Sequence, residues 1–186
     1  LSGGHLLEAR SDFERALELA IARGEHLNLF LSRFADVFRV PAPRREPCRL
    51  GELATAVLRL SQAGAALGIT WELSVDDPSP SASIDRYQLE QVLLNVLKNA
   101  REAVGDRGRI ALRVTHRGGG ARIEVEDNGP GFDAETTSPL FSPFHSTKPQ
   151  GQGIGLTMAR EILIAHGFRF GLESRVGGPT RFWIEL

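Results

Sequence analysis

The chain has 186 residues, 41% of them hydrophobic and 24% charged, with a formal net charge of −1. This length allows one good-sized domain with its own core plus an appended part, and the charge balance excludes the basic excess typical of nucleic-acid binding. The single cysteine, Cys48, excludes an internal disulfide framework and a cysteine-rich zinc site.

No apolar run approaches the roughly 18 residues of a membrane span, and no signal peptide is recognisable. Because the chain begins at Leu1 without a methionine, we expect it to be a fragment of a longer protein. We expect the fragment to be cytoplasmic and to make no membrane contact of its own, which leaves open a membrane anchor elsewhere in the full-length protein.

The first part of the chain carries a helical repeat over residues 12–38, in which apolar and small residues are spaced alternately four and three apart. They are Phe13, Leu17, Ala20, Gly24, Leu27, Leu31, Phe34 and Phe38. This repeat favours a helix of a bundle or coiled coil, although an amphipathic helix packed on its own domain shows a similar stripe. The proline-rich stretch Val40–Pro47 then predicts a linker and a domain boundary near residue 40.

The remainder of the chain alternates between helical and strand patterns, which indicates a mixed architecture of helices and strands. Helices are predicted over residues 51–67, 84–104 and 152–166, and strands over residues 69–75, 109–116, 121–127, 168–174 and 180–186. The glycines at 118–120 indicate a hairpin, and Gly167 is predicted to end the last helix.

Asp127 is the most informative carboxylate. Ile123 and Val125 alternate with polar residues in the strand before it, so strand parity places Asp127 on the apolar face. A carboxylate there needs a partner, and the exocyclic amine of adenine is a suitable one. Gly129 and Gly131 would let the backbone approach a flat ring closely. The same run is also ordinary β-turn chemistry, and the residues alone leave both interpretations open.

Asn95 and Asn99 lie one helical turn apart, on one face of the predicted helix over residues 84–104. Amide oxygens are hard ligands that suit Mg²⁺, which also takes phosphate oxygens. Solvated or capping asparagines are the alternative. Asparagine is mildly unfavourable inside a helix, however, so the pair favours a functional role.

A second glycine stretch opens the last predicted helix, with Gly151, Gly153 and Gly155 followed by Leu156. Free amides and the positive helix end attract phosphate there. Lys148 is a candidate phosphate partner, with a solvated loop lysine as the alternative. The stretch matches neither a dinucleotide fingerprint nor a Walker A loop. Apolar residues within 139–148 predict a lid that packs and unpacks.

The order of these motifs resembles the catalytic and ATP-binding domain of bacterial sensor histidine kinases, over residues 46–186. Five segments are similar to the family's N box, first glycine box, F box, second glycine box and last glycine-threonine box. They are, in that order, Gln91–Ala100, Asp127–Gly131, Leu140–Lys148, Gly151–Leu156 and Gly178–Thr180. Pro179 departs from the last motif, and Lys98–Ala103 is similar to kinases of the nitrogen-regulation type.

The resemblance implies an α+β fold, a two-layer sandwich in which a mixed five-stranded sheet is covered by about three helices and preceded by a long helix. It divides the chain into three parts. Residues 1–40 would form a partial dimerisation and histidine-phosphotransfer helix, residues 41–50 a linker, and residues 51–186 the ATP-binding catalytic domain.

The resemblance also implies ATP and Mg²⁺ as cofactors and assigns roles to the site residues. Asp127 would bind the adenine amine, Asn99 would ligate Mg²⁺, and Asn95 would line the phosphate side. Lys148 would hold phosphates and, with the two asparagines, would serve catalysis. The remaining nucleotide-binding residues would be Gly129, Gly131, Thr147, Gly151, Gly153, Gly155, Leu156 and Thr180.

The implied reaction transfers the γ-phosphoryl of ATP to a histidine and then to an aspartate of a response-regulator receiver domain, in a protein that is homodimeric at full length. In the family the acceptor histidine precedes an acidic residue, whereas His5 and His26 each precede leucine. We therefore expect the acceptor to lie outside this chain and the fragment not to phosphorylate itself.

Two other functions stay open. An ATP hydrolase or conformational clamp of the same superfamily would carry a glutamate where Asn95 falls, and an amide cannot take up the proton of an attacking water. A non-catalytic ATP-binding module, such as an anti-sigma-like partner protein, is compatible with Pro179 and with the missing acceptor.

Overall fold

The structure is a computed structural model of the whole chain. It describes residues 40–133 and 154–186, together with the isolated positions Phe13, Leu17, Ile21, Arg23, Gly24 and Phe141. The chain divides into two units, Leu1–Arg39 and Val40–Leu186. The long helix predicted over residues 12–38 lies mostly outside the described residues and stays a prediction.

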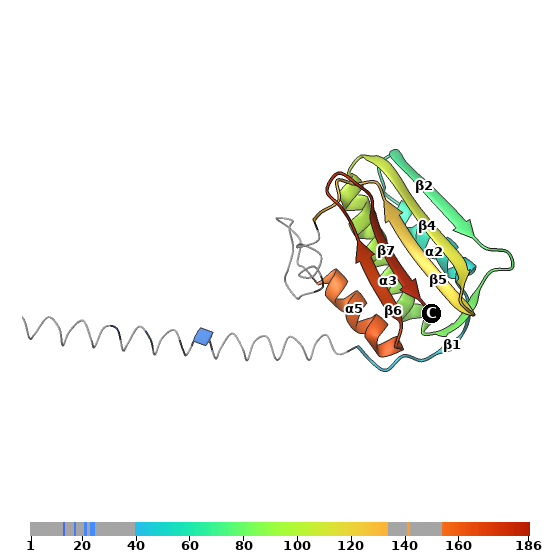
Figure 1. Cartoon of the computed structure of the whole chain (residues 1–186), viewed down its shortest axis with the longest axis horizontal. Coiled ribbons are helices and arrows are strands. Elements are labelled where there is room, and N and C mark those ends of the chain that lie inside the picture. Colours follow the sequence, from blue (N-terminus) through green and yellow to red (C-terminus); the bar gives the residue numbers. More distant parts are fainter. Residues whose placement is uncertain are drawn as a thin grey trace, which may run out of the picture. The chain divides into compact units, whose positions relative to one another are not determined.

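A mixed five-stranded sheet forms the frame of the second unit within its described residues (Figure 1). Its strands are β2 (Gly68–Val75), β4 (Arg107–Arg117), β5 (Gly120–Asp127), β6 (Arg169–Glu173) and β7 (Thr180–Glu185). Their order in the sheet is β2-β4-β5-β7-β6. β2 runs parallel to β4, whereas the other neighbouring pairs are antiparallel.

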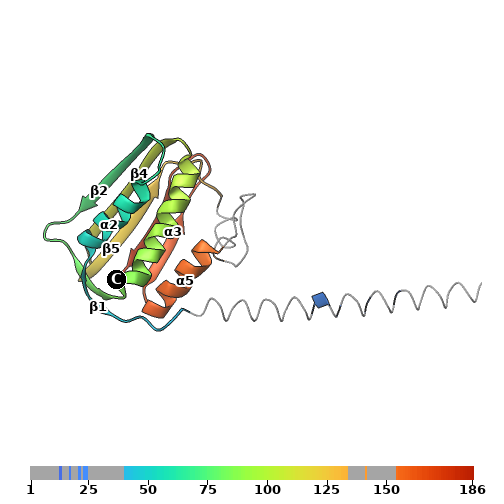
Figure 2. The same ribbon diagram turned by 180° about the vertical axis from the view of Figure 1, so that it is seen from behind.

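Three helices in the described part of the chain cover one face of this sheet (Figure 2). They are α2 (Leu50–Gln62), α3 (Arg86–Val104) and α5 (Gly155–His166), and α3 lies between the other two. Apolar residues of α3 recur every three or four positions and face the core, where Leu93 and Leu97 are fully buried. The predicted α+β sandwich of a five-stranded sheet and three helices is therefore confirmed.

Turn and cap residues decide where the helices begin and end. α3 begins later than predicted, because the Asp85 carboxylate accepts the Gln88 N–H at 3.1 Å and caps the helix there. α2 ends at Gln62, before the predicted end, and Gly64 follows at a positive φ of 71°. α5 ends at Gly167 in the left-handed conformation, as predicted.

A small two-stranded sheet was missed by the sequence analysis. β1 (Glu46–Arg49) pairs antiparallel with β3 (Ser81–Ile84). Residues 46–49 fall in the predicted linker, because the prolines of this stretch lack amide donors. A strand with a single neighbour tolerates proline, since its N–H side needs no partner.

The residues just before β1 lie against the domain. The Pro41 carbonyl accepts a hydrogen bond from Gln88 Nε2 at 2.9 Å, and the Arg44 N–H donates to Asp85 Oδ2 at 3.0 Å. Both partners stand at the N-terminus of α3. The start of the predicted linker is therefore attached to the helix that carries the two candidate asparagines.

Candidate functional site

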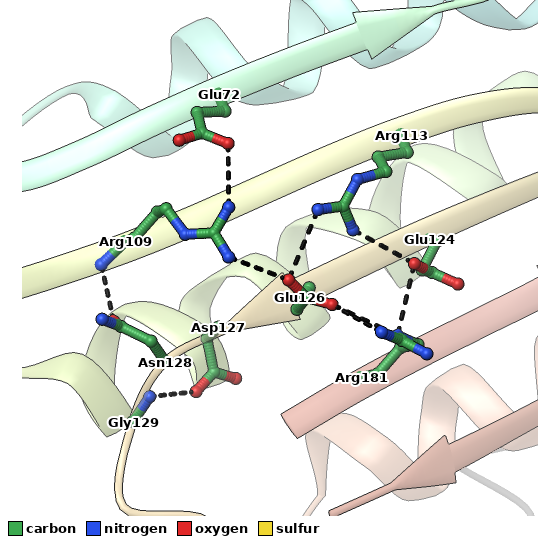
Figure 3. Close-up of polar contacts among 9 residues, drawn as sticks. All are labelled: Glu72, Arg109, Arg113, Glu124, Glu126, Asp127, Asn128, Gly129 and Arg181. Atoms are coloured by element: carbon green, nitrogen blue, oxygen red, sulfur yellow. Dashed lines mark hydrogen bonds and ion pairs between the residues drawn. The ribbon is translucent and has the colours of Figure 1, made fainter. Parts of the chain in front are cut away.

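Asp127 ends β5 on the helix-covered face of the sheet. Its exposed fraction is 5%, beside 1% for Ile123 and 3% for Val125, which confirms the strand parity predicted for this carboxylate. Asp127 Oδ1 accepts the Gly129 N–H at 2.9 Å (Figure 3). The turn and the inward carboxylate, which the sequence left as alternatives, thus occur together.

The loop after Asp127 is packed tightly against two other segments. A Cβ at Gly129 would lie 3.0 Å from the Ala103 Cβ, so the loop runs against the C-terminal end of α3. Gly131 has a φ of 62°, and a Cβ there would overlap the Arg175 carbonyl in the turn between β6 and β7. Both glycines are therefore required by close approach to neighbouring protein segments, and the predicted approach to a flat ring stays a prediction.

Thr180 stands directly opposite Asp127 in the antiparallel pairing of β5 with β7. Opposed residues in such a pair point to the same side of the sheet, so Thr180 shares the helix-covered face with Asp127. Pro179 does not displace it, because β7 begins at Thr180 and the register with β5 is kept. The structure thus brings together the first and last glycine boxes.

Ser174 is a residue that the sequence analysis missed. Its Oγ accepts the Phe132 N–H at 3.1 Å and lies 3.0 Å from Thr180 Oγ1. A second bond joins the same two segments, from the Gly177 N–H to the Pro130 carbonyl at 2.8 Å. No motif marks Ser174, and its role follows only from the position of β6 beside β7.

The asparagine pair lies on α3, further from the loop after Asp127 and toward the start of α5. Asn95 Nδ2 donates to the Gly155 carbonyl at 3.4 Å, so the N box touches the first residue of α5. Asn99 lies one turn further along α3 and is partly exposed. Leu156 packs against the core. The structure therefore brings the N box and the end of the second glycine box into contact.

The start of α5 has features of a phosphate site. Its N-cap residue, Ile154, provides no side-chain hydrogen bond to the first turn in the part of the chain that the structure describes. Amides of the first helical turn have no partner within the helix and suit an anion. Thr147, Lys148, Gly151 and Gly153 lie outside the described residues, so their predicted roles stay predictions.

Phe141 is the described position of the predicted lid. Its ring packs edge-on against Phe170 of β6 with 5.8 Å between ring centres. Its carbonyl accepts a hydrogen bond from Thr157 Oγ1 of α5 at 3.4 Å. One apolar residue of the predicted lid thus contacts both β6 and α5.

The open face of the sheet carries a charged cluster next to Asp127. Adjacent residues of a strand point to opposite faces, and Glu126 accordingly meets Arg109, Arg113 and Arg181 (Figure 3). The Arg181 hydrogen bond lowers the pKa of Glu126 below its usual value against the opposing effect of burial, and Arg113 adds to the lowering. The cluster connects β4, β5 and β7 at the end of the sheet that carries Asp127.

Asn128 continues the pairing of β5 with β4 beyond the last residue of the strand. Its N–H donates to the Arg109 carbonyl at 3.2 Å, and its Oδ1 accepts the Arg109 N–H at 2.6 Å. The first residue of the loop is therefore held to the sheet, which fixes the place where the loop leaves Asp127.

Two kinds of feature are absent from the part of the chain that the structure describes. Among the described residues, no group of three or more histidine, cysteine, aspartate or glutamate side chains is placed to hold a metal ion. No helix of the described part is both long and apolar enough to cross a membrane.

Comparisons with known proteins agree with this geometry. Residues 84–186 match the family described as histidine kinase-, DNA gyrase B-, and HSP90-like ATPase. The chain is 38% identical over 173 residues to the sensory histidine kinase/phosphatase NtrB of Rhizobium leguminosarum, covering 84% of this chain and 45% of NtrB. It is 35% identical over 182 residues to the C4-dicarboxylate transport sensor protein DctB of Rhizobium meliloti, covering 97% of this chain and 29% of DctB.

Solved structures show the same likeness. The catalytic domain of the histidine kinase ThkA superposes with a TM-score of 0.69 at 30% identity, covering 77% of this chain and 95% of that domain. ThkA in complex with the response regulator TrrA superposes with a TM-score of 0.68 at 25% identity, covering 89% of this chain and 48% of ThkA.

The chain spans less than half the length of DctB and NtrB. Its likeness to NtrB agrees with the nitrogen-regulation type expected from Lys98–Ala103. The family match, these two relatives and the ThkA domain all point to one assignment. The chain belongs to the histidine kinase-, DNA gyrase B-, and HSP90-like ATPase family and carries the catalytic ATP-binding domain of a two-component sensor histidine kinase.

Proposed function

We propose that the domain binds ATP with Mg²⁺ and transfers the γ-phosphoryl to a histidine outside this chain. The observation that carries the proposal is the pairing of Asp127 with Thr180 on the helix-covered face, beside the glycine loop. An ionised carboxylate only accepts hydrogen bonds, and the adenine amine only donates them. Asp127 is therefore suited to hold the base.

Helix α3 spans the distance between the two ends of the proposed site. Ala103 contacts the glycine loop, and Asn95 contacts the start of α5. At 1.5 Å per residue the two positions are roughly 12 Å apart along the helix, which is comparable with the length of an extended nucleoside triphosphate. Asn99 lies midway, where its amide oxygen would be a ligand for Mg²⁺, which would neutralise phosphate charge.

The protein's part in phosphoryl transfer is to position the phosphates and to neutralise their charge. The amides at the start of α5 would bind phosphate oxygens, and Asn99 would hold the metal. Lys148, beside Thr147, and the backbone of Gly151 and Gly153 would complete the phosphate end. Asn95 carries an amide, which takes up no proton from water, and this disfavours ATP hydrolysis.

The acceptor would be a phosphotransfer histidine domain of the full-length protein, and the phosphoryl group would pass on to a response regulator. The ThkA–TrrA complex supports a response-regulator partner, since ThkA shares this fold. We further propose that residues 1–40 form part of a dimerisation helix and residues 51–186 the catalytic domain, with the predicted linker over residues 41–50 contributing β1 (Glu46–Arg49) to that domain. The heptad repeat supports the dimerisation helix and a homodimeric full-length protein.

The test is titration with a fluorescent ATP analogue in the presence of Mg²⁺. Asp127→Asn is expected to abolish detectable binding, because it removes the charged acceptor without changing the size of the side chain. Asp77→Asn is the matched control, since Asp77 is exposed in the loop between β2 and β3. Unchanged affinity of Asp127→Asn would refute the adenine assignment. Rapid steady-state release of phosphate by the chain alone would favour a hydrolase instead.

A further inference from the structure

Ser174 lies at a junction between the loop that follows Asp127 and the last strand, β7. It follows β6, and its hydroxyl oxygen contacts both the Phe132 N–H at 3.1 Å and Thr180 Oγ1 at 3.0 Å. Phe132 follows the glycines of the loop, and Thr180 faces the same side as Asp127. One hydroxyl group thus joins both protein segments that would surround the base.

Each hydroxyl group has a single proton to donate, and this favours one direction for the hydrogen bond between Ser174 and Thr180. A serine hydroxyl has one proton and accepts through its oxygen, and the Phe132 N–H already takes an acceptor position on Ser174. If Ser174 donates to Thr180 Oγ1, the Ser174 proton is satisfied. If Thr180 donates instead, the Ser174 proton needs a third partner, and the described residues supply none.

With Ser174 as the donor, the proton of Thr180 is available to a ligand. Asp127 accepts and Thr180 donates, side by side on one face of the sheet. Adenine offers the complement of this pair, since its amine donates and the neighbouring N1 accepts. Hypoxanthine offers the reverse, an accepting O6 and a donating N1–H, so both of its groups would meet a like partner. Mismatched polar groups of this kind are strongly rejected by a buried site.

We propose that Ser174 is a positioning residue for base selection, which orients the Thr180 hydroxyl as a donor and thereby favours adenine over 6-oxopurines. The proposal rests on the proposed function, because it requires the base to lie against Asp127 and Thr180. Thr180 would reach N1 directly or through one water. Ser174 acts through Thr180 and need not touch the nucleotide.

The same junction is held by bonds that do not use the Ser174 hydroxyl. The Gly177 N–H donates to the Pro130 carbonyl at 2.8 Å, and β6 pairs with β7 up to Glu173. Replacing Ser174 with alanine therefore leaves the Thr180 hydroxyl without its donor and free to rotate, while the two segments stay joined. The variant is expected to fold, which makes nucleotide selectivity measurable.

The experiment compares the Mg²⁺ complexes of ADP and inosine diphosphate by isothermal titration calorimetry on the 186-residue chain. The wild-type chain is expected to prefer ADP. Ser174→Ala is expected to weaken ADP binding about threefold to tenfold, the size of one neutral hydrogen bond. Its affinity for inosine diphosphate is expected to stay equal or to rise, since a freed Thr180 hydroxyl can accept from N1–H. The matched control is Ser74→Ala, an exposed serine of β2 on the opposite edge of the sheet.

A second variant separates base selection from a general loss of structure. Thr180→Val removes the hydroxyl and keeps the branched shape that suits a strand. In this background, Ser174→Ala is expected to leave the ratio of the two affinities unchanged, because Ser174 then has no hydroxyl to orient.

The possible outcomes are distinct. If Ser174→Ala weakens both nucleotides by the same factor, Ser174 only stabilises the loop, and the inference fails while the proposed function stands. A change in the ratio that persists in the Thr180→Val background would also overturn it. If the wild-type chain binds neither nucleotide, or does not distinguish them, the adenine assignment fails and the inference fails with it.

Discussion

The Asp85 N–H donates a hydrogen bond to His166 Nε2 at 3.1 Å, which joins the N-terminus of α3 to the last residue of α5. His166 is 2% exposed, and its Nδ1 lies 2.8 Å from the Ile162 carbonyl. Because Nε2 accepts the Asp85 N–H, Nδ1 is the ring nitrogen that donates to the Ile162 carbonyl. Arg45 donates to the His166 carbonyl, so the segment before β1 meets the same junction.

Replacement of His166 by alanine is expected to lower the free energy of unfolding by about 2–3 kcal/mol, because it removes one buried and one partly buried hydrogen bond and a ring packed on Phe168. The measurement is equilibrium denaturation in urea. His116→Ala is the control, since His116 is exposed on β4, and it is expected to cost less than about 1 kcal/mol. Equal losses of unfolding free energy in the two variants would show that the contacts of the His166 side chain contribute nothing special to stability.

The carboxylate of Glu126 is expected to stabilise the sheet more than that of Glu72. Three arginines surround Glu126, whereas Glu72 is half exposed and meets Arg109 alone among its described ion pairs. Glu126→Gln is expected to lower the free energy of unfolding by about 1–2 kcal/mol. This value is modest because the arginines are partly exposed to solvent. Glu72→Gln is expected to lower it by at most about 0.5 kcal/mol. Thermal or urea denaturation would measure both. A larger effect at Glu72 would contradict this assignment.

The contribution of Glu126 is also expected to depend on pH. Its pKa in the folded protein is lowered, chiefly by the Arg181 hydrogen bond. Its stabilisation is therefore complete above the ordinary glutamate pKa and is lost as the pH falls through the lower folded value. The difference in stability between wild type and Glu126→Gln should be largest near neutral pH and should shrink below about pH 4. A difference that grows on acidification would reverse the assigned sign.

Gly131→Ala is expected to abolish nucleotide binding. A Cβ there would overlap the Arg175 carbonyl and lie 2.7 Å from the Gly178 carbonyl, so the loop would be pushed away from the turn between β6 and β7. Gly118→Ala is the matched control, because Gly118 also has a positive φ, of 54°, but has open space around it. The control should lose about 1–2 kcal/mol of stability and keep its affinity for ADP. If Gly131→Ala keeps the ADP affinity of the wild-type chain, the close approach of Gly131 to the turn between β6 and β7 is not needed for nucleotide binding.

Asn99→Ala is expected to weaken ADP binding about tenfold or more when Mg²⁺ is present, and to have little effect when the metal is removed with EDTA. The physical reason is that a metal ligand contributes only through the metal. Calorimetric titration under the two conditions provides the measurement. An equal loss in both would indicate a direct contact with the nucleotide or a structural role.

Local patterns in the sequence determined a large part of this fold. Alternation of Ile123 and Val125 placed Asp127 on the buried face, because strand parity depends only on neighbouring residues. The recurrence of apolar residues in α3 predicted its buried face and put Asn95 and Asn99 together, since helical spacing is also local. The order of the motifs then indicated the family.

Tertiary structure decided the rest, because strand order and contacts between distant segments carry no local periodicity. The pairing of β1 with β3 was missed for this reason, and so was Ser174. Glu126 is one of the polar residues that alternate with Ile123 and Val125, and only the sheet order brings three arginines of neighbouring strands to it. Thr180 reaches Asp127 only because β7 inserts between β5 and β6. The sequence by itself thus determined which residues face inward, and only the tertiary structure decided which of them meet.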